Sequence, residues 1–156
     1  MAAFQSKDGE RLASLVHPNK GVRFSPAAYV ILDEDVVFTR DQASVFWTDA
    51  KTHLWGYAEG SGNPIGMTSA AYAERYILDR DFAHPSSVRI NDDHSSGTTH
   101  NNAAEAYPGA TRVEYYIEPS AGEAEGGSDW AALRLVFEKL DGSWYLIAVI
   151  HDAWSV

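Results

Sequence analysis

The sequence has no cysteine, few basic residues and no long apolar run. Without cysteine, the chain has no disulfide bond, thiolate metal site or cysteine nucleophile, although this alone does not fix its compartment. Lys and Arg number 12 against 22 Asp and Glu, and the basic residues form no cluster. Nucleic acid and anionic membrane surfaces are therefore not expected partners. No apolar run approaches the roughly 18 residues of a membrane span, and the opening MAAFQSKDGERL lacks the basic and apolar regions of a signal peptide.

What is present fits one globular domain over residues 1–156. Hydrophobic residues make up 45% of the chain, with five Trp, eight Tyr and six Phe that can build a core. A chain of this length matches the usual size of one domain, about 100–200 residues. We find no internal repeat, and the location of the protein stays open.

Helices are predicted in the first half of the chain. Apolar residues recur at helical spacing within residues 8–17. Thr39, with Gln42 three residues later, has the pattern of a capping box before a second, short helix. Thr68 or Ser69 caps a third helix within residues 69–82.

Strands are predicted mainly in the second half. Asp141-Gly142 is a favoured hairpin turn between the last two. The polar segment 84–111 is predicted as a long loop and 119–128 as an acidic, Gly-rich loop. The expected strands lie near residues 22–25, on both sides of the turn 60–64, and over 111–118, 130–140 and 143–156.

Alternation along the last three strands sorts their side chains onto two faces. His151 and Asp152 then project to opposite faces and cannot form a dyad with each other. Asp152 and Trp154 are expected to continue the apolar face, and His151 to lie on the mixed face near Arg134. An apolar patch of Val136, Ile147 and Val149 on that mixed face suggests a homodimer contact. The predicted core face holds Val113, Tyr115, Ile117, Leu133, Leu135, Phe137, Trp144, Leu146, Ala148 and Ile150.

The order of elements, with RLASLV in the first helix, GVRF in the first strand and the closing hairpin LRLVFEKLDGSWYLIAVIHD, resembles the nuclear transport factor 2-like, or SnoaL-like, superfamily. The resemblance implies an α+β fold in which a cone-shaped, curved antiparallel sheet wraps around the N-terminal and middle helices and leaves an apolar pocket. The segments LVHPNKGVRFSPAAYV and GSGNPIGMT are also similar to uncharacterised bacterial exported proteins and lipoproteins. The superfamily contains both enzymes and binding domains, and none of its catalytic residues transfers to this sequence.

Five residues are candidates for a site in that pocket. Asp152 is a candidate general acid or base, because a carboxylate at an apolar rim has a raised pKa. Tyr115 is a second catalytic candidate through its hydroxyl, which could also contact a ligand. Trp154, Trp144 and Phe24 complete the expected ligand-binding set. For Asp152, the alternative is a strand end that simply meets solvent.

We expect no metal and no cofactor. Asp92, Asp93, His94 and His100 could ligate a divalent ion, but their spacing matches no recognised site. Three functions remain open from the sequence: a domain that binds a small apolar or amphipathic molecule, a general acid/base enzyme (isomerase, dehydratase or hydrolase), and a non-catalytic dimerisation or assembly module.

Overall fold

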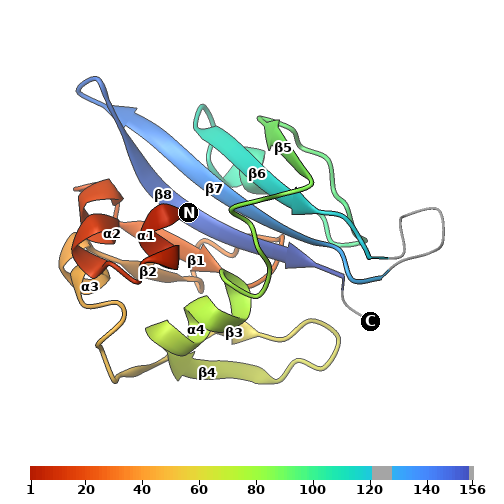
Figure 1. Cartoon of the computed structure of the whole chain (residues 1–156), viewed down its shortest axis with the longest axis horizontal. Coiled ribbons are helices and arrows are strands. Elements are labelled where there is room, and N and C mark those ends of the chain that lie inside the picture. The colour runs from red at the N-terminus through yellow and green to blue at the C-terminus, as the bar shows by residue number, and fades with distance from the viewer. Residues whose placement is uncertain (121–127, 155–156) are drawn as a thin grey trace.

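The computed structural model describes residues 1–120 and 128–154 as an α+β fold with a curved six-stranded sheet and a separate two-stranded sheet (Figure 1). The predicted fold class is confirmed. The large sheet has the order β2-β1-β8-β7-β6-β5. It is mixed rather than wholly antiparallel, because β1 pairs with β8 in parallel.

Three of the described helices, α2, α3 and α4, begin where the sequence supplies a capping side chain. The Asp8 side chain accepts a hydrogen bond from the backbone of Arg11, and Thr39 and Gln42 form the predicted capping box. Thr68, not Ser69, caps the third predicted helix. The helices are α1 (Ala2–Gln5), α2 (Gly9–Leu15), α3 (Arg40–Ser44), α4 (Ser69–Tyr76) and α5 (Ala103–Ala106).

The strands follow the predicted order, with additions at β2 and β5. Asp141 and Gly142 both have positive φ, as a tight hairpin turn requires, and join the two longest strands. The predicted loop 84–111 in fact contains β5 and α5, whereas most of the predicted loop 119–128 lies outside the described residues. The strands are β1 (Val22–Ser25), β2 (Val36–Phe38), β3 (Thr52–Tyr57), β4 (Pro64–Thr68), β5 (Ser87–Ile90), β6 (Thr111–Ile117), β7 (Ala131–Leu140) and β8 (Ser143–Ala153).

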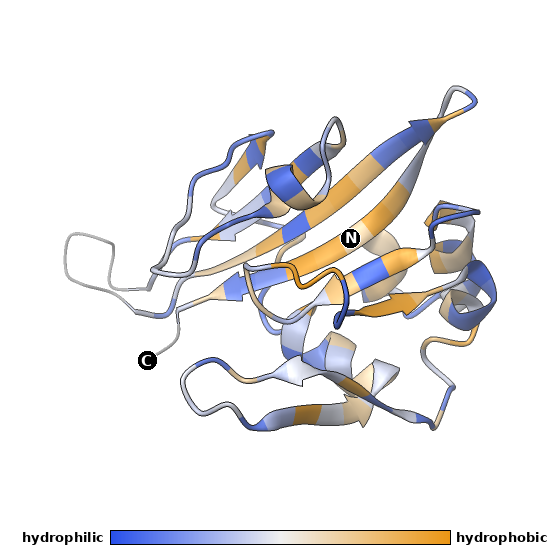
Figure 2. Cartoon of the chain, turned by 180° about the vertical axis from the view of Figure 1, so that it is seen from behind, coloured by the Kyte–Doolittle hydropathy of each residue, from blue (hydrophilic) through white to orange (hydrophobic). Residues whose placement is uncertain are grey.

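The main core lies between the large sheet and the helices α1–α4. Hydrophobic residues run along the two long central strands, β7 and β8 (Figure 2). Phe24 of β1 is fully buried, with its ring against those of Phe38, Phe46, Trp55 and Tyr72. Aromatic side chains of this size dominate the burial of apolar area in a small domain.

A β-bulge in β8 changes which side chains face the core. Val136 pairs with Ala148 and Phe137 with Leu146, so Ile147 is the extra residue. Leu146 and Val149 belong to the main core, whereas Ile147 and Ala148 both belong to a smaller cluster on the opposite face. The predicted assignment of faces is therefore wrong beyond the bulge.

The opposite face of the sheet is covered by the chain itself. Val136 and Ile147 are buried against Val30, Ala103 and Tyr107, which come from the segment after β1 and from α5 with the residue that follows it. The patch that suggested a homodimer is thus an intramolecular core, and Val149 is on the other side of the sheet. Within residues 1–120 and 128–154, no helix is both long and apolar enough to cross a membrane.

Candidate functional site

Two pockets lie at the C-terminal end of β8, one on each face of the sheet. The helix-side pocket has a volume of about 250 Å³ and the loop-side pocket one of about 360 Å³. Trp154 lines both. The helix-side pocket is lined by Pro26, Ala27, Tyr57, Ala58, Glu59, Ile65, Arg75, Tyr76, His151, Ala153 and Trp154. The loop-side pocket is lined by Ser96, Gly97, Thr98, Thr99, Trp130, Asp152, Ala153 and Trp154.

His151 is the central polar residue of the helix-side pocket. Its Nε2 atom lies 3.2 Å from Oδ2 of Asp79, just beyond α4. A carboxylate oxygen only accepts hydrogen bonds, so Nε2 donates in this contact and Nδ1 is the ring nitrogen that remains for another partner. Nδ1 has no hydrogen-bond partner among the residues that the structure describes. The pair therefore has the arrangement of a base whose orientation is fixed by a carboxylate.

A run of aromatic rings supports His151 from the helix side. The His151 ring meets the Tyr76 ring edge-on at 5.4 Å, and Tyr76 stacks on Tyr72 at 4.9 Å. Tyr72 stacks in turn on Trp55 at 4.0 Å. Burial raises the pKa of Tyr76, and Arg75 lowers it by less, so the hydroxyl stays a hydrogen-bond donor at neutral pH.

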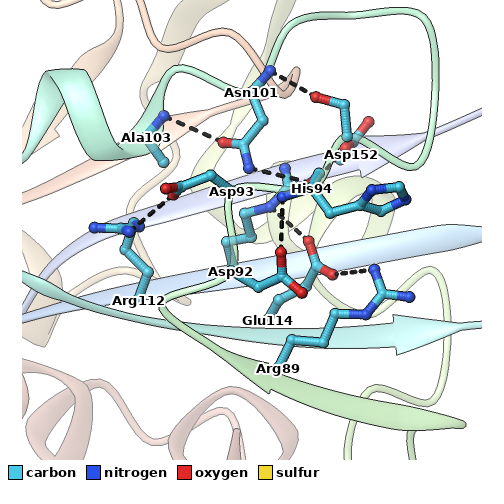
Figure 3. A network of polar contacts seen from close by, with 11 residues as sticks. Arg89, Asp92, Asp93, His94, Asn101, Ala103, Arg112, Glu114 and Asp152 are labelled. Atoms are coloured by element: carbon cyan, nitrogen blue, oxygen red, sulfur yellow. Dashed lines mark hydrogen bonds and ion pairs between the residues drawn. The ribbon is translucent and has the colours of Figure 1, made fainter.

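Asp152 projects to the loop side, where it forms part of a buried ladder of charges. Its Oδ2 atom accepts a hydrogen bond from Arg134 Nη2 at 2.8 Å, and Arg134 Nε lies 2.6 Å from Glu114 Oε2. Glu114 Oε1 accepts from Arg89 Nη1 at 3.0 Å (Figure 3). The ladder crosses β5, β6, β7 and β8, and its two positive and two negative charges balance.

Burial raises the pKa of the Asp152 carboxyl, and the neighbouring Arg134 offsets only part of that effect. Glu114 adds a smaller upward contribution because it is a second negative charge. Arg134 is only 1% exposed, so the interaction is poorly screened by water. The raised pKa expected from the sequence is present, but on the face of the sheet opposite to α1–α4.

The five candidates from the sequence do not form one site. Asp152 and Trp154 come together at the loop-side pocket. Tyr115 packs against the main core from β6, and Phe24 is fully buried within that core. Trp144 is 54% exposed near the hairpin turn, where Lys139 lies over its ring at 5.8 Å, and it lines neither pocket.

Sequence patterns give little indication of the residues that line the two pockets. His151 was expected near Arg134, but the bulge turns it toward Tyr76 and Asp79. Tyr76 and Asp79 are three residues apart within the helix predicted over residues 69–82, a spacing that indicates one helical face, although α4 itself ends at Tyr76. That spacing does not indicate which strand the face meets, and nothing near Trp130 suggested a pocket.

Among the described residues, no group of three or more His, Asp or Glu side chains is arranged to hold a metal ion. Asp93, one of the metal-ligating candidates, instead pairs with Arg112 at 2.8 Å (Figure 3).

No protein-family model matches the sequence, and neither does any curated protein. Among solved structures, a chain described as Rd1NTF2_05 with five substitutions is 16% identical, with 96% of this chain and 87% of that chain covered and a TM-score of 0.38. A calcium/calmodulin dependent protein kinase II association domain from Xanthomonas campestris is 15% identical, with 97% and 78% covered and the same TM-score. Likenesses of this degree assign no function.

Proposed function

We propose that this protein binds a small amphipathic molecule in the helix-side pocket and that His151 is its main polar contact. The observation that carries the proposal is the His151–Asp79 pair, which orients a partly buried imidazole beside a hollow of about 250 Å³. Ligand pockets are typically concave, largely apolar and equipped with a few oriented polar groups. The small volume favours a ligand of one or two rings.

The walls support an amphipathic ligand rather than a purely apolar one. Tyr57, Ile65 and Trp154 offer apolar surface, whereas Arg75 and Glu59 bring one charge of each sign. The Arg75 guanidinium lies over the Tyr76 ring at 5.4 Å, which holds it at the pocket wall. A ligand with a ring and one carbonyl, hydroxyl or carboxyl group would match both kinds of wall.

The test is an NMR titration of the protein with cyclohexanone, phenol and benzoate. At least one compound should shift the signals of His151 and Trp154 in a saturable way. His151→Phe keeps an aromatic ring but removes the hydrogen bond to the ligand, so affinity should fall roughly tenfold, or about 1.4 kcal/mol. An absence of saturable shifts, or unchanged affinity in His151→Phe, would contradict the proposal.

His84 provides a matched control. It also pairs with an aspartate, Asp81, at 2.9 Å, but its side chain is 83% exposed and lies outside the pocket. His84→Phe should therefore leave the affinity unchanged.

A second candidate function is general acid/base catalysis, favoured by the same His–Asp geometry. The sequence pointed instead to Asp152 as the acid or base, and the two residues can be compared directly. In D₂O, a base at the pocket should accelerate exchange of the α-protons of cyclohexanone. Loss of exchange in His151→Gln but not in Asp152→Asn would assign the base to His151, and the reverse result would assign it to Asp152.

A further inference from the structure

The segment 91–102 is fixed across the loop side of the sheet by a set of polar contacts (Figure 3). Asp93 pairs with Arg112 of β6, and the backbone N–H of Asn101 donates to Ser95 Oγ at 3.1 Å. The Asn101 side chain in turn accepts from the backbone of Ala103 at 3.2 Å. Loops that are tied down in this way keep their shape before a ligand arrives.

Gly97 allows this loop to lie directly on the Trp130 ring. A Cβ atom built on Gly97 would lie 2.8 Å from Trp130 Cζ2, closer than real side chains approach. Trp130 is also linked to the end of β8, because Trp154 N donates to its carbonyl oxygen at 3.3 Å. The loop, Trp130 and the end of β8 therefore form the walls of the loop-side pocket.

The polar floor of this pocket offers an acceptor without an unbalanced charge. Asp152 lines the pocket, and its charge is compensated by Arg134, as that of Glu114 is by Arg134 and Arg89. A cationic ligand would gain little from the Asp152 carboxylate, because that charge is already paired with Arg134. An anionic ligand would be repelled by the carboxylate oxygens of Asp152. A neutral ligand that donates hydrogen bonds fits this floor best.

The remaining walls add hydroxyl groups and indole surface. Thr98 and Thr99 lie on the loop, and the buried Trp130 lies on one side. Trp154, which is 45% exposed, lies at the rim shared with the helix-side pocket and offers most of the accessible indole surface. Thr99 Oγ1 donates to Glu59 Oε1 at 2.8 Å, whereas the Thr98 hydroxyl has no hydrogen bond to another described residue. Flat apolar indole beside several polar groups is the surface that matches a ring with hydroxyl groups around its edge.

We propose that the loop-side pocket is a second binding site, for a neutral polyhydroxylated ring such as a sugar or a cyclitol. The ring would lie against indole surface, and its hydroxyl groups would donate to Asp152 and exchange hydrogen bonds with Thr98. This site is independent of the function proposed for the helix-side pocket, because only Ala153 and Trp154 line both.

The experiment is a titration of the ¹⁵N-labelled protein with D-glucose, D-galactose, D-mannose and myo-inositol, each to about 100 mM so that a millimolar site saturates. The indole N–H signals of Trp130 and Trp154 should shift in a saturable way with at least one of them. The exposed Trp144 should not respond, and the signals of Tyr76 should stay in place. Tetramethylammonium chloride serves as the cationic probe.

Thr98→Val is the decisive variant, because it removes one hydroxyl at almost constant shape from an exposed loop residue. The apparent Kd should rise about threefold to tenfold, with no change in the unfolding midpoint. Thr52→Val, on β3 and outside the pocket, should leave the Kd unchanged. Asp152→Asn should weaken binding further, but it also alters the ion pair with Arg134.

Three results would overturn the proposal. The first is an absence of saturable indole shifts with all four compounds. The second is an equal Kd in Thr98→Val and the unaltered protein. The third is a response to tetramethylammonium but not to the neutral compounds. Failure of the cyclohexanone, phenol and benzoate titration would concern only the helix-side pocket.

Discussion

His151 and Asp152 are adjacent in β8, but they lie on opposite faces of the sheet and have different polar environments. His151 has one partner, Asp79, whose side chain is 19% exposed, and its Nδ1 atom has no described partner. Asp152 belongs to a ladder of four charges in which Arg134 contacts two carboxylates. An oriented imidazole with one ring nitrogen left for another partner can contact a ligand, whereas the main role of a residue within a buried ladder of charges is to hold strands together.

The same difference applies to the two pockets. The helix-side pocket is built on aromatic rings of the main core, so its polar group is an addition to an apolar wall. The loop-side pocket is built on a balanced set of charges that the segment 91–102 partly covers. Aromatic packing therefore holds the walls of the helix-side pocket in place, whereas paired charges hold those of the loop-side pocket.

The largest expected effect comes from removing the centre of the ladder. Arg134→Met removes the guanidinium that pairs with Asp152 among the described residues and leaves this carboxyl buried, so it should lower the free energy of unfolding by about 3–5 kcal/mol at pH 7. Urea unfolding measures the loss. Arg89→Met is the matched control: Arg89 is 27% exposed at the outer end of the ladder, and its removal should cost only about 1 kcal/mol or less. Similar losses in both variants would contradict the prediction that Arg134 contributes more to stability than Arg89.

A smaller effect follows from the raised pKa of Asp152. Below the pKa of the unfolded chain, about 3.9, the carboxyl is protonated in both states. Between that value and the higher folded pKa, the folded protein binds more protons, so this contribution to stability falls as the pH rises. The unfolding free energy of the unaltered protein relative to Asp152→Asn should therefore decrease from pH 4 to pH 7. A relative increase over this range would mean that Arg134 outweighs burial.

The smallest effect is expected at Trp144, which the sequence placed in the ligand set. Trp144→Ala removes a half-exposed ring near the hairpin turn and should change the free energy of unfolding by about 1 kcal/mol or less. Titrations of either pocket should give the same Kd as the unaltered protein. A clear loss of affinity would instead show that Trp144 contributes to ligand binding, as predicted from the sequence.

Local signals in the sequence predicted much of the fold. The capping residue Thr39, the cap at Thr68 or Ser69 and the turn Asp141-Gly142 act through hydrogen bonds and dihedral angles within a few residues. Their effects can therefore be predicted without tertiary structure, although the choice of Thr68 over Ser69 is seen only in the structure. The predicted separation of His151 from Asp152 also holds, since it depends only on alternation.

The faces themselves could not be predicted. The run Leu146–Ile150 is apolar throughout, so no polar side chain marks the position where the extra residue enters, and the bulge reverses everything after it. The partners Asp79 and Arg134 lie on other elements, and only the tertiary arrangement brings them to His151 and Asp152. The segment 91–102 shows no hydrophobic periodicity in its sequence, so it could not be assigned a conformation. Its path is fixed by side-chain hydrogen bonds and not by regular secondary structure.

The parallel pairing of β1 with β8 also has a consequence for folding rate. β1 and β2 are close in sequence, and so are β5, β6, β7 and β8, and the two groups meet in one sheet where β1 pairs with β8. This joining brings together residues from opposite ends of the sequence, and closure of such a long loop slows folding. We expect each group to gain partial structure early, with the docking of β1 on β8 as the step that limits the rate. The helix-side pocket, which is lined by Pro26 and Ala27 after β1 and by His151 of β8, would then form only in that last step.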